Sequence, residues 1–122
     1  MNNGRVLVVE NNAIVCHVIS LMLKDFDYDF LIVNSGYAAL DALREEKFDI
    51  MLTDFGMPGM NGMQLVENVR KNDDKLEIIM MTATPALIIR EKAIKFKISA
   101  ILPKPFLMNN LLSLLSKVEA AL

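Results

Sequence analysis

Cysteine, histidine and tryptophan are scarce in this sequence of 122 residues, which has one cysteine, one histidine and no tryptophan. A single thiol, Cys16, cannot close an internal disulfide, and the lack of a Cys/His cluster excludes a thiolate-based metal site. His17 falls off the apolar face of its predicted helix, so we expect it to face solvent. Because a chain with one free cysteine suits a reducing compartment, we expect a cytoplasmic location.

Long apolar runs and an excess of positive charge are also missing. Polar or charged residues interrupt each apolar segment well short of the ~18 residues that span a bilayer, which argues against a membrane protein. Thirteen Lys and Arg stand against fifteen Asp and Glu, which gives a net charge of -2. A chain without a basic surplus lacks the electrostatic footprint of a protein that binds a phosphate backbone, so we expect no direct nucleic-acid binding.

Short apolar runs alternate along the chain with longer helical patterns. The runs are rich in Val, Ile, Leu and Met with little polar alternation, which is typical of strands covered on both faces. They lie at residues 5–9, 30–33, 50–53, 78–82 and 100–102. A length of 122 residues normally makes one core, so we expect residues 1–122 to form a single domain.

Helical spacing predicts one helix after each strand. The predicted helices are one opened by Asn12 with Val15, Val18, Ile19, Met22 and Phe26 on its buried face, one over residues 37–46, one starting near Gly62, one following Pro85, and one over residues 108–121. Five strands each followed by a helix indicate a doubly wound α/β sheet, because parallel strands need right-handed crossovers.

Polar residues follow four of these strands. Glu10 and Asn11 come after the first, Asp54 after the third, Thr82 ends the fourth, and Lys104 follows the fifth. Ligand chemistry in open α/β sheets gathers beyond the carboxyl ends of the strands, so we expect these side chains to converge. Two carboxylates, an amide, a hydroxyl and an ammonium in one cleft suit a hard cation and an anionic group, as phosphoryl transfer requires.

The motifs that carry these residues resemble those of the receiver domains of two-component response regulators. They are VLVVEN at residues 6–11, DFGMPGMNG at 54–62, TA at 82–83 and KPF at 104–106. The match covers essentially the whole chain in the same order, and the D-x-x-M-P-x-M-x-G stretch is its most specific part. The resemblance implies a CheY-like, flavodoxin-like fold with strand order 2-1-3-4-5 and five flanking helices. It implies a signalling module, with at most autocatalytic phosphotransfer and dephosphorylation at Asp54.

The resemblance also implies roles for single residues. Asp54 is the phosphoacceptor, which takes a phosphoryl group from a sensor histidine kinase or a histidine phosphotransfer protein. Lys104 pairs with Asp54 and then with the phosphoryl oxygens, and the Thr82 hydroxyl moves towards them on activation. The backbone amides of Phe55 and Gly56 are expected to cradle the same oxygens.

A magnesium site and a cis peptide bond follow from the same resemblance. The expected ligands of Mg²⁺ are Glu10, Asn11, Asp54 and the backbone carbonyl of Gly56. The Lys104–Pro105 bond is cis in this family, which the weak trans preference before proline permits.

Two positions depart from the family pattern. Asn11 stands where a second carboxylate is usual, and an amide keeps a hard oxygen donor but removes a charge, so we expect Mg²⁺ affinity below the family norm. Ile101 stands at the switch position, where an aromatic residue or histidine usually rotates inward, and its β-branched side chain cannot repeat that swing. These departures leave open a phosphate-independent pseudo-receiver that acts as a protein-interaction module.

Other functions and partners can be weighed from the same residues. A phosphatase of the haloacid dehalogenase type needs a second acid two residues after its nucleophile, where this chain has Gly56. A flavin-binding protein would place Glu10 against the cofactor phosphate, and the two would repel. Leu87, Ile88 and Leu112 exceed what one buried face requires, which indicates a partner surface. The resemblance to receiver domains implies an effector or homodimer contact through the fourth helix, fifth strand and fifth helix.

Overall fold

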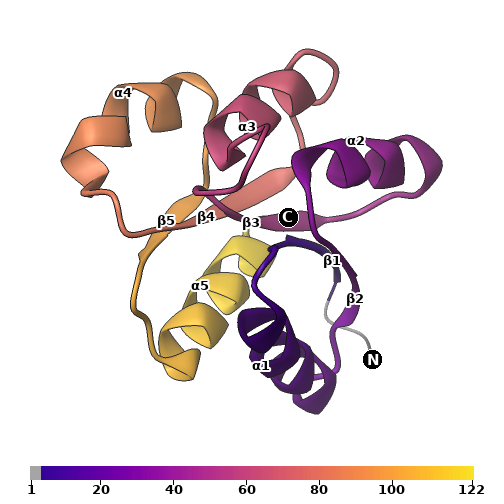
Figure 1. The fold of residues 1–122 in the computed structure, drawn as a ribbon. Helices are drawn as coiled ribbons and strands as arrows, with labels where there is room; N and C mark the ends of the chain where they lie inside the picture. The colour runs from indigo at the N-terminus through magenta and orange to yellow at the C-terminus, as the bar shows by residue number, and fades with distance from the viewer. Residues whose placement is uncertain (1–3) are drawn as a thin grey trace.

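One parallel sheet organises the protein, as the computed structural model, which describes residues 4–122, shows (Figure 1). Its strands lie in the order β2-β1-β3-β4-β5, and all four neighbouring pairs are parallel. The strands are β1 (Arg5–Val9), β2 (Asp29–Val33), β3 (Ile50–Asp54), β4 (Glu77–Thr82) and β5 (Ala100–Pro103). The predicted order is confirmed, and each predicted strand boundary lies within one residue of the observed one.

Five helices cover the two faces of this sheet within the described part of the chain. They are α1 (Ala13–Asp25), α2 (Gly36–Glu45), α3 (Gly62–Arg70), α4 (Ala86–Lys95) and α5 (Met108–Ala120). Helices α1 and α5 lie on one side of the sheet, and α2, α3 and α4 lie on the other (Figure 1). The predicted flavodoxin-like arrangement is therefore confirmed.

Two apolar cores form because successive residues of a strand point to opposite faces. In β1, Val6 and Val8 pack with α1 and α5, whereas Leu7 and Val9 pack with α2 and α3. Strands β1, β3 and β4 are covered on both sides, which explains their nearly continuous apolar sequences. Polar side chains at the ends of these strands therefore stand out as exceptions that need partners.

The predicted buried face of α1 is partly wrong. Ile19 and Met22 are buried as expected, but Val18 is 39% exposed, and Phe26 lies just beyond the helix and is 51% exposed. Leu23 is buried instead, because the helix turns its 19, 22 and 23 positions towards the sheet. Asn12 does cap the helix, since its Oδ1 accepts a hydrogen bond from the backbone N–H of Val15 (3.0 Å).

None of the helices that the structure describes combines the length and the apolar character needed to cross a bilayer. His17 is exposed, as predicted.

The loop between β3 and α3 makes a tight approach that only glycine permits at position 62. The Gly62 N–H donates to the Phe55 carbonyl (2.7 Å), and a Cβ on Gly62 would lie 2.3 Å from the Asp54 carbonyl oxygen. Helix α3 then starts with a capping box, in which Asn61 and Gln64 exchange side-chain to backbone hydrogen bonds. These contacts fix the path of the chain directly after Asp54.

Replacing Gly62 by alanine should therefore destabilise the protein by roughly 2–4 kcal/mol, because backbone atoms rather than a flexible side chain must move. Chemical denaturation followed by circular dichroism measures the change. Gly56→Ala is the matched control, since a Cβ there meets no atom within 4 Å. Equal stability of the two variants would contradict the close approach.

Tyr28 gives the fold a second measurable property, because it is only 8% exposed at the edge of the α1/α5 core. Burial, together with the neighbouring Glu119 carboxylate, raises the pKa of Tyr28 to about 12. The neutral phenol is thus favoured by folding, and its contribution to stability is complete below the ordinary pKa of 10.0 and is lost as the pH rises to about 12.

An alkaline titration followed by tyrosinate absorbance should show a late ionisation near pH 12 that belongs to Tyr28. The Tyr28→Phe variant should lose this late step, whereas Tyr37→Phe, at a position that is 62% exposed, should retain it. Persistence of the late step in Tyr28→Phe would show that burial does not act on this phenol.

Candidate functional site

The carboxyl ends of four strands bring the predicted side chains together at one edge of the sheet. In the register of the sheet, Val9 lies beside Thr53, Asp54 beside Met81, and Thr82 beside Pro103. The next residues along the chain, Glu10 and Lys104, therefore reach the same level as Asp54. The prediction that these strand-end residues converge is borne out by the distances between Lys104 and the two carboxylates.

The ammonium group of Lys104 lies close to two carboxylates in this cleft, those of Asp54 and Glu10. Lys104 Nζ lies 2.7 Å from Asp54 Oδ1 and 3.6 Å from Glu10 Oε1. Glu10 is 1% exposed and Asp54 is 6% exposed. Attraction between opposite charges is stronger in such surroundings than in water, and a buried carboxylate without a cation is costly. Lys104 is therefore the group that allows both acids to be buried together.

Glu10 has one oxygen satisfied by the protein and one that is not. Its Oε2 accepts a hydrogen bond from the backbone N–H of Asn12 (3.0 Å). Its Oε1 is buried without a hydrogen-bond partner among the residues described, and Lys104 Nζ is its charged neighbour. Such an oxygen beside a second carboxylate suits a hard cation, which prefers oxygen ligands.

The residues present thus fit Mg²⁺, although with less charge than a three-acid site. Asn11 is exposed, and no group of three His, Cys, Asp or Glu side chains gathers anywhere in residues 4–122. Glu10 and Asp54 are the two carboxylates available to the ion. Asn11 and the exposed Gly56 remain predicted ligands.

Thr82 is 3% exposed, and its hydroxyl is held in place by the loop that follows it. Thr82 Oγ1 accepts a hydrogen bond from the backbone N–H of Thr84 (2.9 Å), which leaves its own O–H as a donor. The Lys104 N–H donates to the Thr82 carbonyl (2.8 Å), so the β4–β5 ladder holds these two site residues beside each other. The cis Lys104–Pro105 bond is present, as predicted.

The predicted phosphoryl cradle is wrong for Phe55. Its backbone N–H donates to the Met81 carbonyl (2.8 Å), because the β3–β4 ladder continues for one residue beyond Asp54. This amide is already used, so the role predicted for the pair stays a prediction only for Gly56.

Ile101, at the predicted switch position, is half-buried and packs against the core on the α2/α3/α4 side. It pairs with Met80 of β4 and lines an apolar groove along α4 together with Ala86, Leu87 and Ile98. Its side chain therefore lies beside α4, in the groove that follows the length of this helix.

Three positioning groups escaped the sequence analysis: the backbone amides of Asn12 and Thr84, and the side chain of Gln64, which accepts a hydrogen bond from the Asn61 N–H. A backbone amide leaves no trace in residue type, so the first two had no sequence signal. The third had one, since Asn61-x-x-Gln64 matches the pattern of a helix capping box.

Comparison with known proteins gives several similar chains. The Bacillus subtilis protein named "Uncharacterized transcriptional regulatory protein YkoG" is 28% identical over 122 residues, which are 100% of this chain and 52% of that protein. The chain thus spans about half the length of this relative.

Solved structures agree with the fold. The chemotaxis response regulator CheY4 of Vibrio cholerae superposes with a TM-score of 0.87 at 27% identity, over 93% of this chain and 97% of that one. The receiver domain of a Pseudomonas aeruginosa sensor histidine kinase, with a magnesium ion coordinated in its active-site cleft, has a TM-score of 0.85 at 25% identity over 96% of this chain and 98% of that one.

The family model of the response regulator receiver domain matches residues 6–116. This stretch includes all five strands and every side chain of the cleft. The chain therefore belongs to the response regulator receiver domain family, whose members are signalling modules of two-component systems.

Proposed function

We propose that residues 1–122 form one receiver domain that accepts a phosphoryl group on Asp54 from the phosphohistidine of a sensor histidine kinase or a histidine phosphotransfer protein. The contact of 2.7 Å between Lys104 Nζ and Asp54 Oδ1 carries this proposal. It places a buried carboxylate beside a cation that comes from another strand and remains 28% exposed in its side chain. A nucleophile and a charge partner for the transferred group are thereby assembled in one cleft.

The proposed phosphoryl transfer forms one bond to phosphorus and breaks one. A carboxylate oxygen of Asp54 forms a bond to phosphorus while the bond between phosphorus and the donor's imidazole nitrogen breaks, and the ring, protonated on its other nitrogen, leaves as neutral imidazole. Lys104 stabilises the negative charge of the phosphoryl oxygens, and the free O–H of Thr82 donates to one of them. Gly56 is the remaining candidate for a backbone donor at the same place.

Magnesium would be held by Glu10, Asn11, Asp54 and the Gly56 carbonyl. When bound, the ion supplies charge neutralisation for the phosphoryl group and the carboxylates. The orphaned Oε1 of Glu10 supports this assignment, because it is a buried acceptor that a cation would satisfy.

The donor protein has an apolar surface to dock on beside the cleft. A groove of about 420 Å³ borders Lys104 and is lined by Ile14 and Val18 of α1 and by Pro105 and Phe106. Ile14 is 76% exposed and Val18 is 39% exposed. A partner that covers this groove would reach the edge of the sheet where Asp54 lies. The predicted location of both proteins is the cytoplasm.

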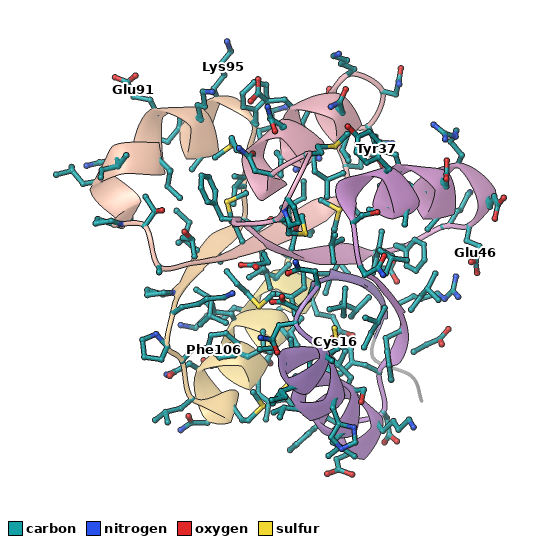
Figure 2. The ribbon with its side chains drawn as sticks, in the orientation of Figure 1. Cys16, Tyr37, Glu46, Glu91, Lys95 and Phe106 are labelled. Carbon is teal, nitrogen blue, oxygen red and sulfur yellow. The ribbon has the colours of Figure 1, made fainter. Side chains whose placement is uncertain are left out.

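The signal would leave through the face made by α4, β5 and α5, to an effector or a second copy of the chain. Leu87 and Ile88 are 80% and 72% exposed, and an apolar groove of about 540 Å³ runs along α4. Glu91 and Lys95 point outward from α4 (Figure 2), and Arg90 and Lys97 line the groove together with its apolar residues. Leu112, which was expected to add to this surface, is half-buried against the α1/α5 core.

Labelling with acetyl phosphate in the presence of Mg²⁺ tests the phosphoacceptor. The wild-type domain should gain the mass of one phosphoryl group in intact mass spectrometry, and Asp54→Asn should gain none, because no other carboxylate pairs with Lys104 at 2.7 Å. Asp74→Asn, at an exposed acid, is the matched control and should label fully. Absence of label on the wild-type domain would overturn the proposal and favour the phosphate-independent module suggested by Asn11 and Ile101.

Asn11→Asp should tighten Mg²⁺ binding about tenfold, since one added unit charge near the ion is worth several kcal/mol gross and about 1.4 kcal/mol after dehydration. Isothermal titration calorimetry measures this affinity. Asn12→Asp adds the same charge one residue later, but that side chain caps α1 and should change the affinity little. Equal gains in both variants would mean that general electrostatics, and not ligation at position 11, sets the affinity.

A further inference from the structure

Positive charge gathers at the C-terminal ends of α3 and α4, although the whole chain has a net charge of -2. Seven of its 13 Lys and Arg residues lie between residues 70 and 97, a stretch that has only four Asp and Glu residues. A hollow of about 380 Å³ lies between the two helix ends. The charged residues that line it are Arg70, Lys71, Lys95, Lys97, Glu67 and Asp74. Four positive and two negative side chains give this lining a formal charge of +2.

Three of the four cations in the hollow are not neutralised by an acid. Lys71, Lys95 and Lys97 are exposed, and none of them forms an ion pair within residues 4–122. Lys71 Nζ donates instead to Asn68 Oδ1 (3.3 Å), and Lys95 Nζ lies over the ring of Phe96, 5.4 Å from its centroid. Figure 2 shows Lys95 pointing outward from α4. These three ammonium groups are therefore available to an incoming anion.

Arg70, the fourth cation, offsets the negative end of helix α4. Its Nε donates to the Phe96 carbonyl (2.7 Å), and its Nη2 donates to the Lys97 carbonyl (3.0 Å). Phe96 is the C-cap of α4, and the open carbonyls of a helix C-terminus would otherwise repel an anion. Nη1 donates to the Asp73 carbonyl (3.0 Å), so all three nitrogens of the guanidinium already have backbone acceptors. The free donors of the hollow are thus its lysines.

Lys97 has a backbone conformation that glycine adopts at lower cost. Its φ is +55°, directly after the C-cap Phe96. The Ile98 N–H donates to the Ala93 carbonyl (2.8 Å), which closes the helix end in a left-handed turn. Glycine is usual at this position because a Cβ is strained there. The turn itself needs no side chain, so the lysine is better explained by where it places its ammonium group.

The hollow lies at the opposite end of α3 from Asp54. Helix α3 begins beside the site, where the Gly62 N–H donates to the Phe55 carbonyl (2.7 Å). Its nine residues carry the chain about 13 Å away along the helix axis, at a rise of about 1.5 Å per residue. Of the described residues, none lines both this hollow and the groove beside Lys104. A partner bound in the hollow would therefore leave the cleft open.

We propose that the hollow is a docking site for an acidic segment of a partner protein, which binds whether or not Asp54 carries a phosphoryl group. Lys71, Lys95 and Lys97 pair with carboxylates of the segment, and the half-buried Phe96 is the apolar part of the lining. Charge complementarity of this kind speeds association and selects acidic partners over basic ones.

The other charges around the hollow favour a protein segment over a phosphate backbone or an anionic membrane. Both of these carry closely spaced negative charge that would meet Asp74 and Glu67, whereas a peptide can space its carboxylates to avoid them. Glu67 is already paired with Lys92, whose Nζ lies 3.5 Å from its Oε2. Arginine is the usual fork for phosphate groups, but the nitrogens of Arg70 are occupied. Single ammonium groups suit single carboxylates.

Fluorescence anisotropy of a fluorescein-labelled oligoglutamate peptide measures binding to the 122-residue chain. A Gly-Ser peptide of the same length and with the same label is the neutral probe and should not bind. The triple variant Lys71→Gln/Lys95→Gln/Lys97→Gln should bind the acidic peptide about tenfold more weakly, because three exposed ion pairs of modest strength are lost together. Raising the salt from about 0.01 M to about 0.15 M should weaken wild-type binding, since exposed charges are screened.

The matched control removes the same charge elsewhere. Lys24→Gln/Lys47→Gln/Lys117→Gln changes three exposed lysines outside the hollow and should alter the affinity by less than about twofold. An equal loss of affinity in both triple variants would overturn the site. Single-stranded DNA and phosphatidylserine vesicles are the competing probes, and tighter binding of either one than of the oligoglutamate peptide would overturn the choice of a protein partner.

Two single variants test the remaining parts of the proposal. Lys97→Gly relieves the positive φ, so its denaturation midpoint should not fall, yet it should weaken peptide binding about twofold. Full affinity in Lys97→Gly would overturn the role of this lysine. Asp54→Asn should bind the peptide as the wild type does, and a loss of affinity there would overturn docking that is independent of the phosphoryl group.

Discussion

The shared ammonium of Lys104 is the interaction on which the site depends. Glu10 and Asp54 are both almost completely buried, and their only described cation is Lys104 at 3.6 Å and 2.7 Å. Two buried carboxylates without it would repel each other and lose their hydration at the same time. With it, the formal charge of the three groups is -1, from two negative charges and one positive. A site with this net charge still attracts a cation.

The fold supplies this arrangement through register more than through local structure. The central strands are apolar on both faces, so the sheet is fixed by two cores, and its strands end at one level where polar residues can meet. Gly62 and the capping box at Asn61 then carry the chain sharply away from Asp54. Asp54 is thereby left at the end of a strand with a short, well-defined loop behind it, which is a sound base for positioning a side chain.

Sequence patterns predicted the strand boundaries because the central strands have no polar alternation, and the sheet order followed from the family resemblance. They predicted the face of α1 less well, since Val18 and Phe26 fit the apolar period but are not covered by the sheet. Side-chain motifs identified Glu10, Asp54, Thr82 and Lys104, whose chemistry is visible in residue type. They misplaced the amide of Phe55 and gave no sign of the Thr84 amide, because any residue other than proline presents the same N–H.

The Arg70 guanidinium donates hydrogen bonds to the backbone carbonyls of Phe96, Lys97 and Asp73. These contacts escaped prediction for the same reason, since all three acceptors are backbone groups. An arginine at the end of an amphipathic helix predicts only a solvated cation or a favourable helix dipole contact. Its contacts cross from α3 to the far end of α4, and such long-range pairs become visible only when the helices are placed on the sheet.

The two ends of α4 are held differently, because Arg70 donates to the carbonyls of Phe96 and Lys97 at its C-terminal end, whereas no side chain among residues 4–122 caps its N-terminal end. A ligand shifts a conformational equilibrium only by the contacts that differ between the two states. Lys104 is already paired with Asp54 at 2.7 Å before any phosphoryl group arrives, so most of its attraction is present in both states. In the proposed phosphorylated state, the added contact would be a hydrogen bond from the Thr82 hydroxyl to a charged oxygen, worth about 1.5–3 kcal/mol. A helix anchored at both ends by contacts like those of Arg70 would not yield to a difference of that size. The N-terminal end of α4 has a proline at its cap and an exposed first turn, so it is the less firmly anchored end of this helix.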